Sequence, residues 1–122
     1  MDDTPSNLPA TITSCFPSRE SNVAMPKLLE TAGGAGRFAW EEFIYGRIRN
    51  EGTRRAYSFA INRFLNWCGD RGCELNRIAP AHVGRYLDEQ SYAPATKKLH
   101  LSALRHFFDE LALRHVVVLN PA

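Results

Sequence analysis

The fold is decided by residues 50–69, which read NEGTRRAYSFAINRFLNWCG. Apolar side chains recur there at the period of an α-helix, which predicts a helix over about 51–69 with one broad buried face. Asn50 is a favourable N-cap, and Gly69 and Gly72 are placed to end the helix. The opposite, polar face also carries a large apolar residue, Phe59. The side chains predicted to be buried are Tyr57, Ala60, Ile61, Phe64, Leu65, Trp67 and Cys68.

Three further amphipathic segments flank this helix. Pro80 and Pro94 each suit the first position of a helix, which predicts helices over about 80–89 and 94–113. Another helix is predicted over about 37–48, before the central one. Its larger apolar residues are Phe38, Ile44, Tyr45 and Ile48, with Trp40 and Phe43 widening the stripe. The inward residues of the last two helices are Val83, Tyr86 and Leu87, then His100, Leu101, Leu104, Phe107, Phe108 and Leu111.

Both ends of the chain lack sustained apolar periodicity. Residues 1–25 combine prolines with a Ser/Thr/Asn-rich run, so we predict a disordered tail. Residues 26–30 can form one helical turn, which the glycine-rich residues 33–36 are expected to end. Residues 116–122 read VVVLNPA, which disfavours a helix and predicts an extended segment. The expected fold class is an all-α, four-helix bundle with a disordered N-terminal tail.

Composition bounds the class of protein. The 122 residues are 44% hydrophobic and 23% charged, which is typical of one globular domain. No apolar stretch is long enough to span a membrane, and the N-terminus lacks the features of a secretory signal. Three cysteines argue against a disulfide framework, so a cytoplasmic location is expected. Residues 1–35 carry a net charge of −2 and residues 36–122 a net charge of +4, which permits a polyanionic partner.

Residue spacing reveals no catalytic or metal-binding constellation. Cys68 and Cys73 have no histidine at ligand spacing, so the zinc patterns fail. Cys68 falls on the apolar arc and is expected to be packed, and His100 is expected to be a core histidine rather than a base. The glycine-rich residues 33–36 lack the strand and the Lys-Ser/Thr pair of a phosphate loop. We therefore predict no catalytic residue, no metal, no cofactor and no small-molecule substrate.

Five motifs follow one another along the chain. They are Pro26-x-Leu28-Leu29 with Phe38…Glu42-Phe43; Asn50-x-x-Thr53-Arg54-Arg55-Ala56-Tyr57 with Phe64-Leu65-x-Trp67-Cys68; Ile78-x-Pro80-x-His82-Val83-x-x-Tyr86-Leu87; Ala93-Pro94-Ala95-Thr96 with Leu101-Ser102-Ala103-Leu104-Arg105-x-Phe107-Phe108-x-x-Leu111; and Asn120-Pro121-Ala122. Leu-Ser-Ala-Leu alone is a weak signal, but five motifs in order are a strong one. Together they resemble the SAM-like core-binding domain of tyrosine recombinases, or phage integrases, over residues 26–122.

The resemblance implies half of a C-shaped clamp on double-stranded DNA. The second and fourth predicted helices, over about 51–69 and 94–113, lie against the duplex in this family. It divides the chain into a tail at 1–25, a core-binding domain at 26–119 and the start of a linker at 120–122. The catalytic arginines, lysine, histidine and tyrosine of the family belong to a separate catalytic domain. None is carried over to these residues, so the chain itself is not expected to be an enzyme. Full-length relatives act in DNA integration and site-specific recombination, together with other recombinase subunits.

Basic side chains along the second and fourth predicted helices agree with a DNA partner. Arginine, lysine and helix N-termini all favour phosphate oxygens, and Asn62 is suited to reading an adenine edge. The competing interpretation is a solvated basic face, with Arg105 paired to Asp109 one turn later. The candidate DNA-binding residues are Arg54, Arg55, Asn62, Arg63, Thr96, Lys97, Lys98 and Arg105.

Two positions depart from the family pattern, and two alternative functions stay open. Ala93 stands where the family has a serine N-cap, which loses roughly 1 kcal/mol. Lys97 replaces an aliphatic residue, so its ammonium must reach water or a phosphate. The first alternative is a stand-alone remnant that binds DNA or a recombinase without catalysis. The second is a helical protein-interaction module that uses Phe59, which the salt dependence of binding would distinguish from DNA binding.

Overall fold

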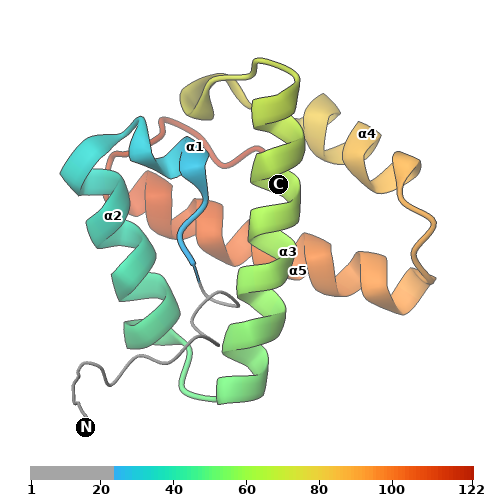
Figure 1. Ribbon diagram of the computed structural model, residues 1–122, viewed down its shortest axis with the longest axis horizontal. Coiled ribbons are helices and arrows are strands. Elements are labelled where there is room, and N and C mark those ends of the chain that lie inside the picture. The colour runs from blue at the N-terminus through green and yellow to red at the C-terminus, as the bar shows by residue number, and fades with distance from the viewer. Residues whose placement is uncertain (1–23) are drawn as a thin grey trace, which may run out of the picture.

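The structure is a computed structural model that describes residues 24–122, and within that range it contains helices and no strand (Figure 1). Its elements are α1 (Lys27–Glu30), α2 (Gly33–Glu41), the π-helical turn η2 (Glu42–Arg47), α3 (Glu51–Asp70), the 3-10 turn η3 (Leu75–Arg77), α4 (Pro80–Glu89) and α5 (Pro94–Leu113). The all-α class is confirmed, and α3, α4 and α5 match the helices expected over about 51–69, 80–89 and 94–113.

The expected count of four helices is too low for the described residues. The turn expected at 26–30 is a separate short helix, α1, which makes five α-helices between residues 24 and 122. Leu29 of α1 is fully buried, so this helix belongs to the core. The disordered tail expected over 1–25 falls largely outside the described range. Of its residues, Ala24 is exposed, and Met25 is half-buried against the core.

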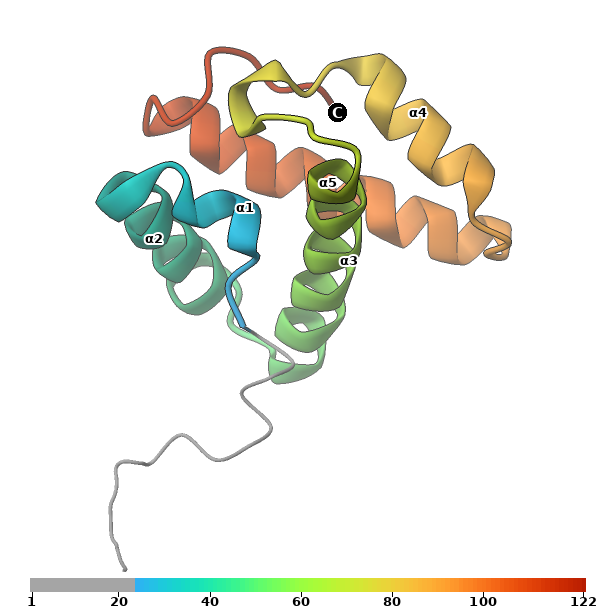
Figure 2. The same cartoon turned by 45° about the horizontal axis from the view of Figure 1, so that its top comes forward.

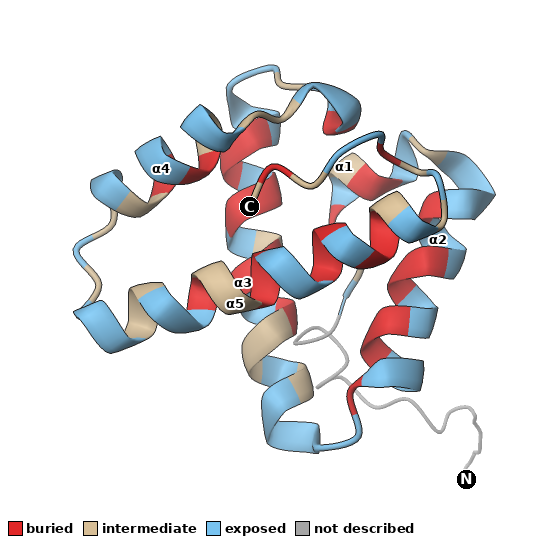
Figure 3. Cartoon of the chain, turned by 180° about the vertical axis from the view of Figure 1, so that it is seen from behind, coloured by how far each residue is buried: buried red, intermediate tan, exposed pale blue. Residues whose placement is uncertain are grey.

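The two longest helices, α3 and α5, cross near the centre of the fold and form its most extensive helix–helix contact. Figures 1 and 2 show α2 on one side of α3 and α4 on the other, near the C-terminal end of α3. Figure 3 shows buried residues gathered on the sides of α2, α3 and α5 that turn toward one another. The outer surfaces of these helices are mostly exposed.

The N-terminal end of α3 is closed by the cap that the sequence predicts. The Oδ1 atom of Asn50 accepts a hydrogen bond of 2.9 Å from the backbone N–H of Thr53. The first N–H groups of a helix have no partner within the helix, and this bond satisfies one of them. At the start of α5, Ala93 provides no side-chain cap, as its identity requires, and Pro94 occupies the first turn.

The helix expected over 37–48 begins four residues earlier than predicted. The glycine-rich residues 33–36 open α2 rather than only ending α1. Gly33 has a φ of +66°, in the left-handed region that favours glycine, and so turns the chain between the two helices. A Cβ at Gly36 would lie 2.6 Å from the carbonyl oxygen of Leu29, so glycine is needed for α1 and α2 to pack this closely. The glycine-rich residues 33–36 therefore allow α1 and α2 to pack closely against each other.

The apolar stripe of this helix also differs from the prediction. Phe38 and Tyr45 were expected to face inward, yet both are exposed. Trp40 and Phe43, expected only to widen the stripe, are 3% and 2% exposed. The buried residues Gly36, Ala39, Trp40, Phe43 and Ile44 recur at the spacing of a regular α-helix, and Phe38 and Tyr45, seven residues apart, share the opposite face. Large apolar residues thus lie on both faces of this helix, and the prediction chose the wrong one as the inward face.

Aromatic rings from four helices form the centre of the core. Phe64 of α3 is fully buried, and its ring centroid lies 5.3 Å from that of Tyr86 in α4 and 6.3 Å from that of Phe108 in α5. Phe107 of α5 is also fully buried, and its centroid lies 5.6 Å from that of Trp40 in α2. Because these rings come from α2, α3, α4 and α5, one connected cluster fixes the helices relative to one another.

Trp67 holds the C-terminal end of α3 against α4. Its Nε1–H donates a hydrogen bond of 3.0 Å to the Oε1 atom of Glu89, the last residue of α4. The guanidinium of Arg71 lies 4.0 Å from the centroid of a Trp67 ring and pairs with the same carboxylate at 2.9 Å. Only 9% of Trp67 is exposed, so the indole is packed as well as bonded.

A cluster of ion pairs joins the C-terminal part of α5 to η2. The side chain of Glu110 is 1% exposed, and its Oε1 atom lies 2.6 Å from Nε of Arg47. Its Oε2 atom pairs with Arg114, which also lies 3.6 Å from Oε1 of Glu42. A buried carboxylate costs several kcal/mol to desolvate unless charged partners compensate it. Two arginines that remain partly exposed provide that compensation here.

After α5 the chain turns back instead of extending. The helix ends at Leu113, and His115 adopts a φ of +61°, the left-handed conformation common just after a helix. No strand follows, but turns and bends replace the expected extended segment. The Nδ2 atom of Asn120 donates to the carbonyl oxygen of Arg105 at 2.9 Å and to Oδ1 of Asp109 at 2.6 Å. These bonds tie the segment to the exposed side of α5.

Candidate nucleic-acid interface

A shallow groove of about 380 Å³ lies where the N-terminal half of α3 meets that of α5. We call it the α3–α5 groove. It is lined by Arg55, Ala56, Phe59, Thr96, Leu99 and His100. These residues range from the buried His100 to the exposed Arg55, Phe59 and Leu99. The lining contains one cation and no acidic side chain, which makes it suited to an anionic partner.

Three of the candidate residues lie at or beside this groove. Arg55 is paired with Glu51 at 3.6 Å, and the two side chains are 47% and 65% exposed. An exposed pair of this kind is worth about 0–1 kcal/mol, so Arg55 can exchange it for a phosphate at little cost. Thr96 is half-buried in the first turn of α5, and Arg63 is exposed with its guanidinium 5.8 Å from the ring centroid of Phe59.

The two candidate lysines lie outside the groove lining. Successive helix residues are about 100° apart, so Lys98 is about 200° around α5 from Thr96 and faces away from the groove. It is exposed. Lys97 is half-buried and lies two turns before the buried Leu104 on the same side of α5. This agrees with a lysine whose stem packs against the bundle while its ammonium reaches water.

Arg54 is engaged inside the fold. Its Nε donates to the carbonyl oxygen of Ile44 at 2.9 Å, and its Nη2 donates to that of Ile48 at 3.0 Å. The guanidinium also lies 5.1 Å from the ring centroid of Tyr45. The last carbonyls of a helix lack partners within it, and Arg54 satisfies two such groups at the end of η2. The side chain therefore joins η2 to α3.

Asn62 is engaged as well. Its Nδ2 atom donates to the carbonyl oxygen of Ala24 at 2.8 Å and to that of Ser58 at 2.9 Å. Both amide hydrogens are thus used within the chain. The bond to Ala24 ties the segment that precedes α1 to the middle of α3. An adenine contact by Asn62 would require these bonds to break, because pairing with adenine uses the same amide.

Arg105 lies on the exposed side of α5, away from the groove lining. Its Nε donates to the carbonyl oxygen of Ala122 at 3.2 Å. Asp109, the partner of Arg105 in the competing interpretation, instead accepts a hydrogen bond from Asn120. Of the eight candidate residues, the structure therefore brings Arg55, Arg63 and Thr96 together. It places Lys97 and Lys98 elsewhere on α5 and uses Arg54, Asn62 and Arg105 within the fold.

His100 forms the buried end of the groove and is a core histidine, as expected. It is 3% exposed, and its Nδ1 atom lies 3.2 Å from the hydroxyl oxygen of Tyr86. Its ring centroid lies 4.7 Å from that of Tyr92. Burial, and secondly the positive charge of Arg63, lower the pKa of His100 below its ordinary value of 6.5. Both effects favour the neutral imidazole.

This lowered pKa predicts a pH-dependent stability. The unfolded chain takes up a proton at His100 near pH 6.5, whereas the folded chain resists it, so the free energy of unfolding should fall as the pH drops below about 6.5. Above that pH the contribution is fully present. Urea unfolding at about pH 7.5 and about pH 5.5 measures the loss. His100→Gln should have a flatter profile than the natural chain, and equal slopes in the two proteins would contradict the assignment.

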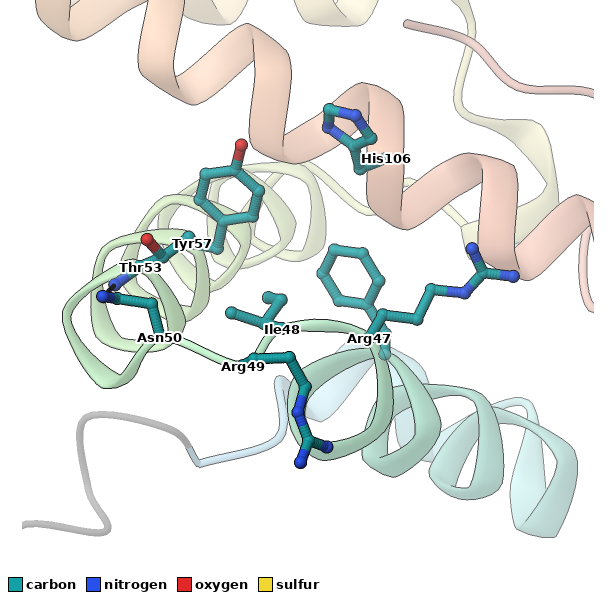
Figure 4. Close-up of a pocket in the computed structure, with 8 residues that line it drawn as sticks. Arg47, Ile48, Arg49, Asn50, Thr53, Tyr57 and His106 are labelled. Carbon is teal, nitrogen blue, oxygen red and sulfur yellow. Dashed lines mark hydrogen bonds between the residues drawn. The ribbon is translucent and has the colours of Figure 1, made fainter.

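A second hollow, of about 520 Å³, lies between the end of η2, the first turns of α3 and the middle of α5 (Figure 4). It is lined by Phe43, Arg47, Ile48, Arg49, Asn50, Thr53, Tyr57 and His106. Arg47 is already paired with Glu110, and Asn50 caps α3. Arg49 is exposed and forms no hydrogen bond or ion pair with the residues that the structure describes. It is thus a further cation beside the N-terminus of α3.

Sequence reasoning missed Arg49 and Leu99 as surface candidates. Arg49 precedes the N-cap of α3, where no periodic pattern assigns a face. Leu99 could have been found, because it lies three residues after Thr96 and so on the same side of α5. It was not chosen because only polar and charged residues were considered as candidates for DNA contact.

The thiol of Cys68, near the C-terminal end of α3, is unsuited to nucleophilic chemistry. Cys68 is fully buried, as expected. Burial, and secondly the neighbouring Cys73 thiol, raise the pKa of Cys68 to about 12, so the thiolate is scarce at neutral pH. Across residues 24–122, no cluster of histidine, cysteine and carboxylate side chains has the geometry to hold a metal ion. No helix in that range has the length and apolar character that crossing a membrane requires.

Comparison with known proteins identifies the domain. A family model described as phage integrase, N-terminal SAM-like domain, matches residues 40–115, which is more than half of the chain. The match includes all of α3, α4 and α5, and thus both sides of the α3–α5 groove. Neither a curated protein nor a solved structure matches the chain. The order of the helices, the motifs along them and the family match agree, and the chain belongs to the phage integrase N-terminal SAM-like domain family.

Proposed function

We propose that the chain is the DNA-binding domain of a tyrosine recombinase and that the α3–α5 groove faces the duplex. The observation that carries the proposal is the groove itself, an open surface lined by Arg55, flanked by Arg63 and free of acidic lining residues. A DNA major groove is about 12 Å wide and admits an α-helix, with phosphates along both edges. The N-terminal turns of α3 and α5 lie next to this surface and favour phosphate oxygens.

Tyr57 and Tyr86, the tyrosines of α3 and α4, use their hydroxyls within the fold. The hydroxyl of Tyr57 lies 3.3 Å from Oγ of Ser102, and that of Tyr86 lies beside His100 within the core. Both hydroxyls are thus engaged within the fold, and we assign strand cleavage to another part of the recombinase. We assign DNA integration and recombination to the whole recombinase, whose other subunits are expected partners. Residues 24–122 then supply one side of its grip on DNA.

Salt dependence tests the proposal directly. In a clamp, binding by one domain raises the effective concentration of DNA at the other, and a single domain loses this gain. We therefore expect weak binding to duplex DNA, with a Kd of about 10⁻⁴–10⁻⁶ M at physiological salt. Contact with about six phosphates gives a slope of about −5 when log affinity is plotted against log salt concentration. Fluorescence anisotropy of a labelled duplex over a salt series measures both. Binding that is insensitive to salt would contradict the proposal and favour the protein-interaction alternative for the Phe59 surface.

Arg55 and Lys98 form a matched pair of variants for locating the DNA surface. Arg55→Ala should weaken binding to every duplex alike and reduce the salt slope by about 1, because one phosphate contact is lost. Lys98→Ala removes the same charge from the far side of α5 and should leave the slope nearly unchanged. Both residues are exposed, so both variants should keep the natural melting temperature. Equal losses of affinity in the two variants would show that the groove is not the contact surface.

A further inference from the structure

The outer part of the α3–α5 groove is apolar. Phe59 and Leu99 remain 54% and 39% exposed, and both line the groove beside Ala56. Single exposed apolar residues are ordinary on protein surfaces. Two large ones that share a groove with a cation form a combined surface, which fits a partner that offers both apolar and anionic groups.

The ring of Phe59 is held in place before any partner binds. Its centroid lies 6.3 Å from that of His100, at an interplanar angle of 87°, and 5.8 Å from the guanidinium carbon of Arg63. His100 is itself fixed by burial and by contact with Tyr86. A side chain that is already ordered loses little conformational entropy on binding. The groove therefore presents a preformed apolar surface.

DNA carries one apolar group in its major groove, the C5-methyl group of thymine. Its phosphates lie along both edges of that groove, where Arg55 and Arg63 are placed to meet them. An apolar protein surface would also suit Phe59, but it would offer no anionic group to Arg55, whose exposed pair with Glu51 is weak enough to be exchanged for a phosphate. The absence of acidic residues from the groove lining favours the anionic partner.

We infer that Phe59 and Leu99 read thymine methyl groups, so that the chain favours T·A pairs where the α3–α5 groove meets the bases. This inference rests on the proposed DNA-binding function. It shifts sequence recognition from Asn62, whose amide hydrogens are used within the fold, to an apolar pair on two helices. Recognition then depends on a methyl group that can be removed from DNA without changing base pairing.

The test compares two short duplexes of the same A·T-rich sequence, one with thymine and one with uracil at every thymine position. They differ only in the methyl groups. Burying one methyl group corresponds to an affinity change of about three- to fourfold, so two contacts predict about tenfold weaker binding to the uracil duplex. Phe59→Ala should make the two affinities nearly equal, and Leu99→Ala should reduce the difference. Fluorescence anisotropy at one fixed salt concentration measures all of these ratios.

Phe38 supplies a matched control. It is 53% exposed and lies under the guanidinium of Arg114 at 4.9 Å, much as Phe59 lies beside Arg63, but it belongs to α2. Phe38→Ala should keep the full preference for thymine. A G·C-rich duplex provides the converse test, because 5-methylcytosine in place of cytosine restores a methyl group and should tighten binding by the natural chain but not by Phe59→Ala.

Each outcome separates the inference from the proposed function. Equal affinity for the thymine and uracil duplexes, with a steep salt slope, would overturn methyl recognition and leave DNA binding intact. Failure to bind either duplex would overturn both. If Phe59→Ala weakened both duplexes by the same factor, Phe59 would be a contact without sequence preference, and the inference would fall.

Discussion

Replacing Phe64 with alanine is expected to lower the free energy of unfolding by about 3–5 kcal/mol, because the change removes a fully buried ring and leaves a cavity. The ring contacts Trp67 of its own helix as well as α4 and α5, so three helices lose packing at once. A domain of this size has a total stability of about 5–15 kcal/mol, so the loss is a large share of it. Urea unfolding followed by circular dichroism measures the change.

Two companion variants make this result interpretable. Ile61→Val, which trims another fully buried residue of α3, should cost only about 0.5–1.5 kcal/mol and remain folded if Phe64→Ala does not. Phe59→Ala removes the same number of atoms from an exposed position and should change stability by less than about 0.5 kcal/mol. A loss below about 1 kcal/mol for Phe64→Ala would place the centre of the core elsewhere.

The second large effect is expected at Glu110. Removing both of its partners, Arg47→Ala with Arg114→Ala, leaves a buried carboxylate without compensation and should cost about 3–5 kcal/mol. When Glu110→Met is added, the same two arginine changes should cost much less, because an apolar residue of similar size needs no charged partner. Urea unfolding of the four proteins gives the coupling as the difference between the two costs.

A surface pair provides the comparison for this cluster. Arg77 pairs with Glu74 at 3.3 Å, with side chains 80% and 72% exposed. Arg77→Ala should change stability by less than about 1 kcal/mol, since water replaces the lost partner. If the two arginine changes cost the same with and without Glu110, the cluster would have to be regarded as surface charge rather than as a compensated buried group.

The sequence predicted best where a helix carries an unbroken period and a recognisable start. Residues 51–70 have both, in Asn50 and in the apolar arc that includes Phe64, and the structure agrees within one residue at the C-terminal end. The prediction for the helix over 37–48 was wrong in its inward face and in its first residue. Large apolar residues lie on both of its faces, and its early start depends on the close contact of Gly36 with Leu29, which exists only once two helices pack in space.

The candidate surface was predictable in its helices but not in its individual residues. Residue types suggested a basic face, yet Arg54 and Asn62 donate to carbonyl groups that only the folded chain brings within reach. The partner of Asn62 is residue 24, thirty-eight positions away, and no local pattern reports such a bond. Exposure of Phe59 was predictable, because its place on the helix opposes the apolar arc. Its position next to Leu99 was not predictable, because the two residues share a groove only where α3 and α5 cross.

The two tryptophans of this chain report on different parts of the fold by their fluorescence. Trp40 is surrounded by the aromatic core between α2 and α5, whereas Trp67 is bonded to Glu89 and covered by Arg71 where α3 meets α4. Both indoles are shielded from water, so their emission should shift to longer wavelength when the chain unfolds. Neither lines the α3–α5 groove. An optical signal that changes with unfolding but not with occupation of the groove therefore separates, in every variant, a damaged fold from a damaged surface.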